Sequence, residues 1–515
     1  MCGIAGFCNF KEDFEENTDY WNFRLEKMRA VLAHRGNDAR GRYLKKHIGL
    51  SHSRLAIRDI LCGDQPMTRT HNGYEYTICY NGEIYNTDEL IPELSENGFV
   101  CSTTSDTEVI LYAYIHWGAD FVNRLNGIFA FAIWDAAKSQ LLLYRDRVGV
   151  KPLFYAIRGD SLVFGSEPKA CFAHPAVKPE LDKQGLQELL AIGPAHTSGL
   201  SLFKDLFEVL PGHFMIYSRD GLHDETYWEL TSREHTESYR DTVAHTRFLV
   251  EDAIKRQMVS DVPVCTFLSG GIDSSIVTAI AANYMNTRGK TLNTFSFDFK
   301  DNDRYFKANA FQPERDLPYV NRMLEEYETA HSYLECDENS LFKALFAAVD
   351  AKDMPGMTDV DSSLLYFCSL VSRKNKVALT GECADEIFGG YPWFYRKELL
   401  ERYGFPWSSD VAPRLALLRD DVGLELDLSG YQAFQYEESR SKAPLLYGEA
   451  GEDESRRIIG YLNIKWFMQT LLDRMDRTSM YSELEARVPF ADHRIIEYVF
   501  NVPWHMKYQN GVEKT

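Results

Sequence analysis

The sequence predicts two folds in succession: an α+β sandwich of antiparallel sheets, then an α/β domain with a doubly wound parallel sheet. The 515 residues exceed what one hydrophobic core usually serves, which favours two domains. From Gly49 to about Gly165, short β-type runs alternate with turn residues, as in antiparallel sheets. Beyond residue 242, single strands alternate with helices, the pattern of a parallel sheet. We therefore expect one domain at 1–228 and a second at 229–515.

Strands covered on both faces are predicted for the first domain. The run YTICY at 76–80 is followed by turn residues, and GIFAFAIW at 127–134 begins a strand, turn and strand. In GIFAFAIW both alternating sets of side chains are apolar or small, which indicates two stacked sheets covered by helices. One such helix should begin near Ser105, because SDTE has the spacing of a capping box ahead of the apolar run VILYAYIHW.

The second domain should begin after a polar linker at 229–242, where ELTSREHTESYRDT lacks apolar periodicity. The run VPVCTFL at 262–268 is typical of a buried strand, and DSSIVTAIAANYM at 273–285 is typical of a helix. Two further strands are expected at 291–299 and 376–380.

The composition describes a globular protein with an acidic surface. The formal net charge of -20 repels phosphate backbones and anionic lipid, so neither nucleic acid nor a membrane is an expected partner. The N-terminal segment turns acidic within a dozen residues and no apolar run approaches about 18 residues, so we expect a cytoplasmic location. The ten cysteines lack CxxC spacing, which argues against zinc and thiol–disulfide chemistry.

Cys2 is the first candidate catalytic residue. Removal of Met1 would leave a thiol and a free α-amino group on one residue, so that Cys2 supplies nucleophile and base together. An α-amino group has a pKa of about 7.7 to 8.0, near working pH, and can take the thiol proton and return it to a leaving amine. Gly3 would let a substrate approach the backbone. The alternative is an inert buried thiol.

Five motifs accompany Cys2: HRGND from His34, SRLAIRD from Ser53, NGEIYN from Asn81, SDTE from Ser105 and RDRVGVKPLFY from Arg145. Together they resemble the class II glutamine amidotransferase domain, from Met1 to about Tyr227. The resemblance implies an N-terminal-nucleophile (Ntn) type αββα sandwich in which Cys2 attacks the glutamine amide. It also implies that Asn81 and the Gly82 N–H stabilise the oxyanion, that Arg54 binds the glutamine carboxylate, and that Glu83 and Asp106 bind its α-ammonium group.

Other readings of these residues stay open. Asp106 could cap its helix, Asn81-Gly82 could form a hairpin turn, and Arg54 could make a surface ion pair. The motif at His34 departs from the family at Asn37, where proline is usual, and we expect only a local change in the loop.

A second centre is predicted at LSGGIDSS, from Leu268 to Ser275. Between a strand and a helix, the N–H groups of Ser269, Gly270 and Gly271 would form a concavity suited to pyrophosphate. Because GxxxxGK[ST] is absent, the loop differs from that of kinase-like NTPases. It resembles the PP-loop of ATP pyrophosphatases, which adenylate a substrate; the alternative is an ordinary glycine turn.

A second loop, in KVALTGECADEIFGGY at 376–391, should meet the first at the ligand-binding edge of the sheet. Asp273 and Asp385 are hard oxygen donors that could hold Mg²⁺, and Glu382 is placed to act on the acyl-adenylate or on attacking ammonia. The alternative for these acids is a solvated position at a helix start.

With LDRMDRTSMYSELEARVPFADH at 472–493, these loops resemble the synthetase domain of glutamine-dependent asparagine synthetases, from about Glu229 onward. The resemblance implies hydrolysis of glutamine, adenylation of aspartate by ATP, and ammonia transfer through an internal tunnel. We expect Arg474, Arg477 and Arg487 to serve ion pairs and domain packing. The ATP-binding residues implied are Leu268, Ser269, Gly270, Gly271, Asp273, Ser274, Phe297, Thr380 and Gly381.

Two departures limit the resemblance. In GMTDVDSS at 356–363, Asp359 and Asp361 stand where many synthetases have threonine and arginine, so the anchor of the aspartate carboxylate is not assigned. The chain stops at GVEKT, where family members continue through a lysine that offsets charge during adenylation, so we expect a C-terminal truncation. A ligase that amidates another carboxylate, in a peptide or sugar acid, and a catalytically impaired homologue are the alternatives. The expected ligands are glutamine, aspartate, ATP and Mg²⁺, and the family is compatible with a homodimer.

Overall fold

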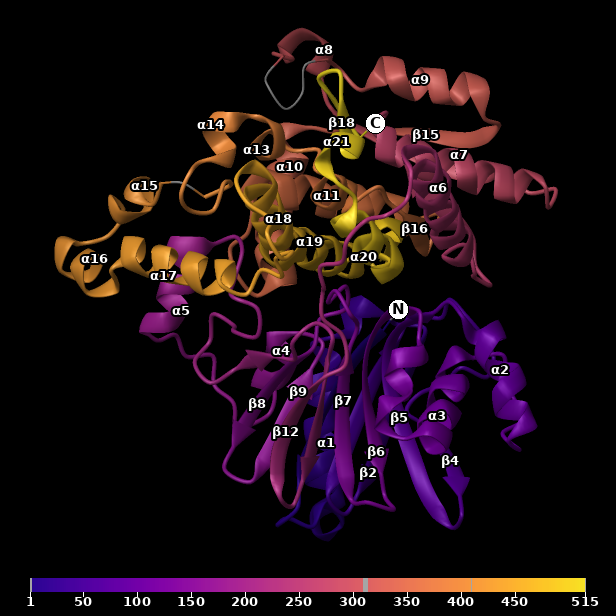
Figure 1. The fold of residues 1–515 in the computed structure, drawn as a ribbon. Coiled ribbons are helices and arrows are strands. Elements are labelled where there is room, and N and C mark those ends of the chain that lie inside the picture. The colour runs from indigo at the N-terminus through magenta and orange to yellow at the C-terminus, as the bar shows by residue number, and fades with distance from the viewer. Residues whose placement is uncertain (1, 309–313, 409, 515) are drawn as a thin grey trace.

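The computed structural model describes residues 2–308, 314–408 and 410–514. Its two halves are stacked, with the N-terminal strands on one side of the contact and the C-terminal helices and parallel strands on the other (Figure 1). An extended segment without helix or strand, from Tyr227 to Ser238, links the two halves.

The N-terminal half contains two six-stranded antiparallel sheets. The first has the order β10-β8-β9-β1-β3-β2 and the second β12-β11-β7-β6-β5-β4. The strands are β1 (Cys2–Asn9), β2 (Ala39–Lys45), β3 (Ile48–Arg54), β4 (Met67–His71), β5 (Tyr74–Ile84), β6 (Gly127–Asp135), β7 (Gln140–Arg145), β8 (Phe154–Arg158), β9 (Ser161–Gly165), β10 (Phe207–Glu208), β11 (His213–Ser218) and β12 (Gly221–Thr226).

The two sheets pack face to face and each is covered by helices. Between them lie Ile4 and Leu50 of the first sheet and Ala130 and Leu143 of the second. On the outer faces, α1 (Thr18–Ala30) and α4 (Pro168–Phe172) cover the first sheet, whereas α2 (Thr87–Glu96) and α3 (Asp106–Trp117) cover the second. The layers are therefore αββα, as the two-sided apolar pattern of residues 127–134 predicts.

The C-terminal half is built on five parallel strands in the order β15-β14-β13-β16-β17. Val264 of β13 faces a core shared with α6 (Tyr239–Arg256), α7 (Ile272–Asn286) and α20 (His493–Asn501). Its neighbour Cys265 faces α11 (Thr358–Val371) on the other side of the sheet. Helices on both faces make this a doubly wound sheet, which confirms the predicted fold class. The strands are β13 (Val264–Phe267), β14 (Leu292–Phe299), β15 (Thr329–Cys336), β16 (Val377–Leu379) and β17 (Glu485–Arg487).

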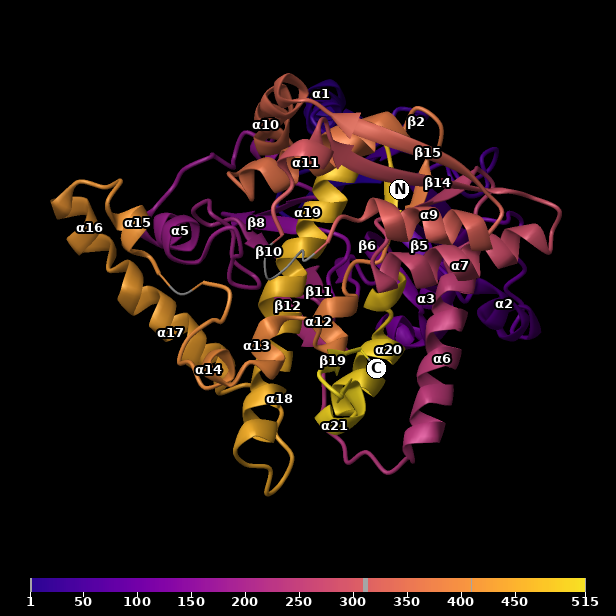
Figure 2. The ribbon, with the colours of Figure 1, turned by 90° about the horizontal axis from the view of Figure 1, so that it is seen from above.

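Helices form most of the rest of this half. Seen from above, α18 and α19 cross its middle, and α15 to α17 extend to one side as an arm (Figure 2). The helices are α6 (Tyr239–Arg256), α7 (Ile272–Asn286), α8 (Asn302–Tyr305), α9 (Leu317–Glu326), α10 (Glu338–Lys352), α11 (Thr358–Val371), α12 (Ala384–Phe388), α13 (Pro392–Tyr395), α14 (Lys397–Leu400), α15 (Ala412–Leu415), α16 (Asp420–Leu426), α17 (Leu428–Arg440), α18 (Glu452–Leu462), α19 (Met468–Met480), α20 (His493–Asn501) and α21 (Trp504–Lys507). A short hairpin, β18 (Tyr508–Gln509) and β19 (Val512–Glu513), follows α21.

Two local predictions differ from the structure. The antiparallel strands extend beyond the predicted range of 49–165, because β1 and β2 precede it and β10 to β12 follow it. The predicted linker is too long, because Tyr239–Thr242 form the first turn of α6, where the Ser238 side chain accepts a hydrogen bond from the Asp241 N–H.

Among the described helices, none combines the length and apolar character needed to cross a membrane.

Candidate functional site

Cys2 lies at the start of β1, opposite Arg54 on β3, with 7% of its surface exposed. Its backbone is held from both sides: the N–H donates to Asn81 Oδ1 at 2.9 Å, and the carbonyl accepts from Arg35 Nε at 3.1 Å. Burial raises the pKa of the thiol, while the Leu55 N–H and the Arg54 charge act in the opposite direction. Met1, whose removal the predicted chemistry requires, lies outside the described residues.

Asn81 and Gly82 lie inside β5, opposite Ala130 and Phe129 of β6, so they do not form a hairpin turn. Asn81 Nδ2 is buried and has no hydrogen-bond partner among the described residues. A buried amide N–H without an acceptor is costly, and it can be satisfied by a bound oxygen atom. At Gly82 a Cβ would come within 2.2 Å of the Ile128 carbonyl oxygen, which explains why glycine is needed there.

The three charged residues predicted to bind glutamine, Arg54, Glu83 and Asp106, are all buried. The Asp106 carboxylate accepts from the Tyr80 hydroxyl and the Ile84 N–H, at 2.9 and 3.0 Å, while Ser105 caps the helix; Asp106 is therefore not the cap. Glu83 Oε2 has no partner among the described residues, and burial, with Asp106 nearby, raises the pKa of Glu83 well above its usual value.

Arg54 is not a surface residue, because only 5% of it is exposed. Its guanidinium donates to the carbonyls of Asp59 and Ile60 and to the Asp64 carboxylate, at 2.6, 3.1 and 2.9 Å. These bonds fold the loop after β3 around the guanidinium. A ligand carboxylate would have to join or replace one of these acceptors.

The glycine loop of the second centre runs from β13 into α7. Gly270 has a φ of +85°, a left-handed conformation that suits glycine, and Ser274 Oγ lies 3.2 Å from the Ser269 N–H and 3.1 Å from the Gly271 carbonyl oxygen. The second loop packs on it: a Cβ on Gly381 would come within 2.8 Å of Ser274 N. The two loops therefore meet at the carboxyl ends of β13 and β16, at the helix N-terminus of α7.

Asp273 and Asp385 converge on one cation, Lys514. Its Nζ lies 2.5 Å from Asp273 Oδ2 and 2.6 Å from Asp385 Oδ1. Burial alone would lower the pKa of Lys514, but the two carboxylates raise it, so the ammonium stays charged. The sequence analysis assigned no role to Lys514, although this lysine is present in the final segment GVEKT.

Glu382 lies beside this cluster on the loop after β16. Its Oε1 accepts from Arg474 Nη2 at 2.9 Å, and its N–H lies 3.4 Å from Thr380 Oγ1. Arg477 and Arg487 also make ion pairs, with Asp353 and Glu485 respectively. All three arginines thus have the pairing role predicted for them.

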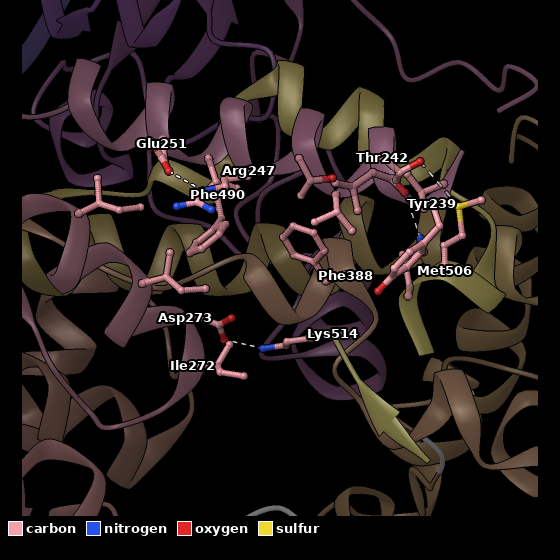
Figure 3. Close-up of a pocket in the computed structure, with 18 of the residues that line it drawn as sticks. Tyr239, Thr242, Arg247, Glu251, Ile272, Asp273, Phe388, Phe490, Met506 and Lys514 are labelled. Atoms are coloured by element: carbon pink, nitrogen blue, oxygen red, sulfur yellow. Dashed lines mark hydrogen bonds and ion pairs between the residues drawn. The ribbon is translucent and has the colours of Figure 1, made fainter. Parts of the chain in front are cut away.

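Two cavities border the glycine loop. The smaller is lined by Leu268, Ser269 and Phe297 together with residues of β14 and α9. The larger, of about 470 Å³, has Asp273 and Lys514 at its edge, pointing toward one another, but its walls are mainly apolar and include Phe388 and Phe490 (Figure 3). The backbone of residues 269–271 does not line the larger cavity. The larger cavity is therefore not the place where these N–H groups would bind phosphate.

The acidic pair in GMTDVDSS separates into two environments. Asp361 is buried, and its Oδ2 accepts from the Met357 N–H at 2.9 Å and lies 3.5 Å from Lys352 Nζ. Asp359 is exposed at the start of α11. Asp361 therefore has a structural partner, and neither residue identifies an anchor for a substrate carboxylate.

The chain combines two sites: the buried Cys2 thiol, next to an Asn81 side-chain N–H without a hydrogen-bond partner among the described residues, and a glycine loop at the edge of a parallel sheet. This combination is that of an amidotransferase coupled to a nucleotide-dependent synthetase. The comparisons with known proteins agree. Residues 1–228 match the glutamine amidotransferase domain family, and residues 245–515 match the asparagine synthase family. This chain belongs to the glutamine-hydrolysing asparagine synthetase family.

Three relatives illustrate the range of this similarity. Asparagine synthetase [glutamine-hydrolyzing] 3 of Bacillus subtilis is 48% identical over 515 residues, 100% of this chain and 83% of the relative. Asparagine synthetase [glutamine-hydrolyzing] 1 of the same organism is 29% identical over 549 aligned residues, with coverage of 100% and 83%. Amidase chyE of Penicillium rubens is 30% identical over 572 aligned residues, with coverage of 98% and 83%.

Proposed function

We propose that the chain hydrolyses glutamine at Cys2 and uses the ammonia, with ATP, to convert aspartate to asparagine. The observation that carries the proposal is the buried, unpartnered Asn81 Nδ2 next to a thiol whose backbone is fixed on both sides. Membership of the glutamine-hydrolysing asparagine synthetase family gives the same overall reaction.

In the first half-reaction, the Cys2 thiolate attacks the amide carbon of glutamine. Asn81 Nδ2 and the Gly82 N–H donate to the oxyanion as it forms, and the Cys2 α-amino group transfers the thiol proton to the departing ammonia. Water then cleaves the thioester to give glutamate and restores the thiol. Glu83 and Asp106 bind the α-ammonium group of glutamine, and Arg54 binds its carboxylate.

In the second half-reaction, Ser269, Gly270 and Gly271 bind the phosphates of ATP through their N–H groups. The aspartate side-chain carboxylate attacks the α-phosphorus, pyrophosphate leaves, and ammonia then displaces AMP from the acyl-adenylate. Lys514 offsets negative charge on the phosphates, and Glu382 accepts a proton from the attacking ammonia. We assign Leu268, Phe297, Thr380 and Gly381 to the adenosine moiety, and Asp273 and Ser274 to the phosphate end.

Asp273 and Asp385 also fit a magnesium ion. Their carboxylate oxygens already converge on one cation, and both are hard donors, so the pair could take Mg²⁺ together with phosphate oxygens. The ion would supply further charge compensation at the phosphates.

Replacement of Cys2 by alanine tests the first half-reaction. We expect Cys2→Ala to abolish glutamate formation from glutamine, because the nucleophile is lost, while ammonia-dependent asparagine formation continues. Cys8→Ala is the matched control, because Cys8 is a buried thiol on the same strand with no role in the proposal. Glutaminase activity retained by Cys2→Ala would contradict the assignment.

A second acceptor acid remains a candidate. The similarity to an enzyme named an amidase, and the unassigned anchor near Asp359 and Asp361, favour tests with other carboxylates. Pyrophosphate release should depend strictly on aspartate if the primary proposal holds; release with a peptide or sugar acid in its place would favour the alternative.

We further propose that residues 1–228 and 229–515 are the two domains, that the protein acts in the cytoplasm, and that it forms a homodimer. The extended segment at 227–238 supports the boundary. Limited proteolysis should cut within this segment, and light scattering should give the mass of two chains.

A further inference from the structure

Helix α19 contacts the synthetase centre directly and is linked to the Cys2 centre through Arg35. Arg474 of this helix pairs with Glu382 of the synthetase centre. Two residues along, Asp476 reaches in the other direction and accepts from Arg35 of the N-terminal half. Arg35 in turn donates to the carbonyl of Cys2. The C-terminal half is thus two hydrogen bonds away from the nucleophile.

Asp476 is an ionised acid buried among cations of the other half. Its Oδ2 accepts from Arg35 Nη2 and its Oδ1 from Lys151 Nζ, both at 2.8 Å, and the three side chains are at most 1% exposed. Burial alone would raise the pKa of Asp476, but Arg35 and Lys151 hold it below its usual value. The carboxylate therefore remains charged and keeps both bonds.

Arg35 transmits this contact to Cys2 because its planar guanidinium is bound on every side. Nη2 donates to Asp476, Nη1 to Glu167 at 2.9 Å, and Nε to the Cys2 carbonyl at 3.1 Å. The guanidinium geometry is rigid, so two carboxylates fix its plane and hence the direction of Nε. Without Asp476, only Glu167 would hold the plane, and the group could turn about that bond.

We propose that Asp476 positions the nucleophile through Arg35, so that the C-terminal half completes the glutaminase centre. Asp476 touches neither substrate nor thiol and is a positioning residue. The inference rests on the proposed role of Cys2. A small displacement of a nucleophile costs rate rather than binding, so kcat for glutamine hydrolysis should fall while KM is kept.

The experiment compares two full-length variants that differ only in the carboxylate facing Arg35. Lys151→Met keeps the Asp476–Arg35 bond. The double variant Lys151→Met/Asp476→Asn removes the charged Asp476–Arg35 bond. Because it loses one cation and one anion, the buried cluster keeps the net charge of the unaltered protein, and Arg35 and Lys151 are not left together without Asp476. Glutamate formation is measured without ATP, ammonia-dependent pyrophosphate release is measured separately, and thermal unfolding checks the fold of both variants.

We expect the double variant to lose about 10-fold or more in glutaminase kcat relative to Lys151→Met, with KM for glutamine and the ammonia-dependent rate changed by less than about twofold. Equal kcat values in the two variants would overturn the proposal. So would an equal loss of both activities, since that is the result of general damage. A wild-type protein that forms no glutamate would instead refute the role of Cys2 itself.

A second variant keeps the test decisive if the double variant does not fold. Asp476→Glu preserves both charges but moves the carboxylate by one methylene group. It should also lower glutaminase kcat without raising KM, and an unchanged kcat would overturn the proposal. Lys376→Met is the matched control, because the Lys376–Asp38 pair also joins the two halves but does not contact Cys2.

Discussion

Two carboxylate–cation clusters with similar distances serve different purposes in this molecule. In one, Asp476 bonds to Arg35 and Lys151 at 2.8 Å, and the side chains are at most 1% exposed. In the other, Lys514 bonds to Asp273 and Asp385 at 2.5 and 2.6 Å, but the Lys514 and Asp385 side chains are 13% and 39% exposed. Burial, not distance, separates a cluster that joins two halves from one that can exchange partners with a ligand.

The largest expected effect is on stability in the buried cluster. Asp476→Ala leaves Arg35 and Lys151 in a dry site without their shared anion, and we expect it to lower the free energy of unfolding by about 3–5 kcal/mol. Urea unfolding followed by fluorescence measures this change. A loss below about 1 kcal/mol would show that the cluster behaves like a surface pair.

In the cluster of Lys514, Asp273 and Asp385, a substitution should affect catalysis more than stability. Lys514→Met removes the cation that faces the phosphates, so ammonia-dependent asparagine formation should fall by about 100-fold or more. The free energy of unfolding should change by no more than about 1 kcal/mol, because water and counterions reach the remaining carboxylates. A rate close to that of the unaltered protein would place Lys514 outside the reaction.

A third ion pair, between the largely buried side chains of His196 and Glu208, extends the comparison to the effect of pH. Burial alone would lower the pKa of His196, but Glu208, 3.1 Å away, raises it to about 9. Because this exceeds the unfolded value of about 6.5, the pair stabilises the fold fully below pH about 6.5, and the effect is lost as pH rises through about 9.

The test uses His196→Gln, which keeps a hydrogen-bonding side chain without the charge. Its stability deficit relative to the unaltered protein should reach no more than about 3 kcal/mol near pH 6 and shrink toward pH 9.5. Thermal unfolding at the two pH values measures the change. A deficit that does not vary with pH would mean that the imidazolium charge contributes nothing.

The smallest effect should come from Lys376 and Asp38, an ion pair 2.7 Å apart that also joins the two halves but is about one-third exposed. Lys376→Met should cost less than about 1 kcal/mol, and added salt should reduce the cost further. A loss as large as that of Asp476→Ala would mean that burial does not set the strength of these ion pairs.

The sequence was sufficient for the fold class because its signals are local. The two-sided apolar pattern at 127–134 and the strand–glycine–helix order around Ser269 each depend on adjacent residues. Burial of Asn81 and Gly82 inside a strand was not foreseen, because the same dipeptide favours turns. The strand forms because β6 pairs with β5 from Tyr76 to Ile84, a stretch that includes Asn81 and Gly82.

Long-range charge pairing was beyond sequence reasoning. Arg35 and Asp476 are 441 positions apart, and nothing in either motif specifies the other as a partner. The ion pairs predicted for Arg474, Arg477 and Arg487 are present, but the sequence analysis did not single out Asp476, the acid between the first two, which contacts the other half. Lys514 was overlooked for a similar reason, since its partners come from two distant loops.

The route from α19 through Arg35 to Cys2 also bears on recombination between relatives. A chimaera that takes its first 228 residues from one parent and the remainder from another inherits a guanidinium whose counter-ion is encoded by the second parent. Crossovers should succeed where both parents supply a matching acid at that point of the helix. Elsewhere the hybrid would fold around an unmatched charge, however similar the two parents are in the rest of their sequence.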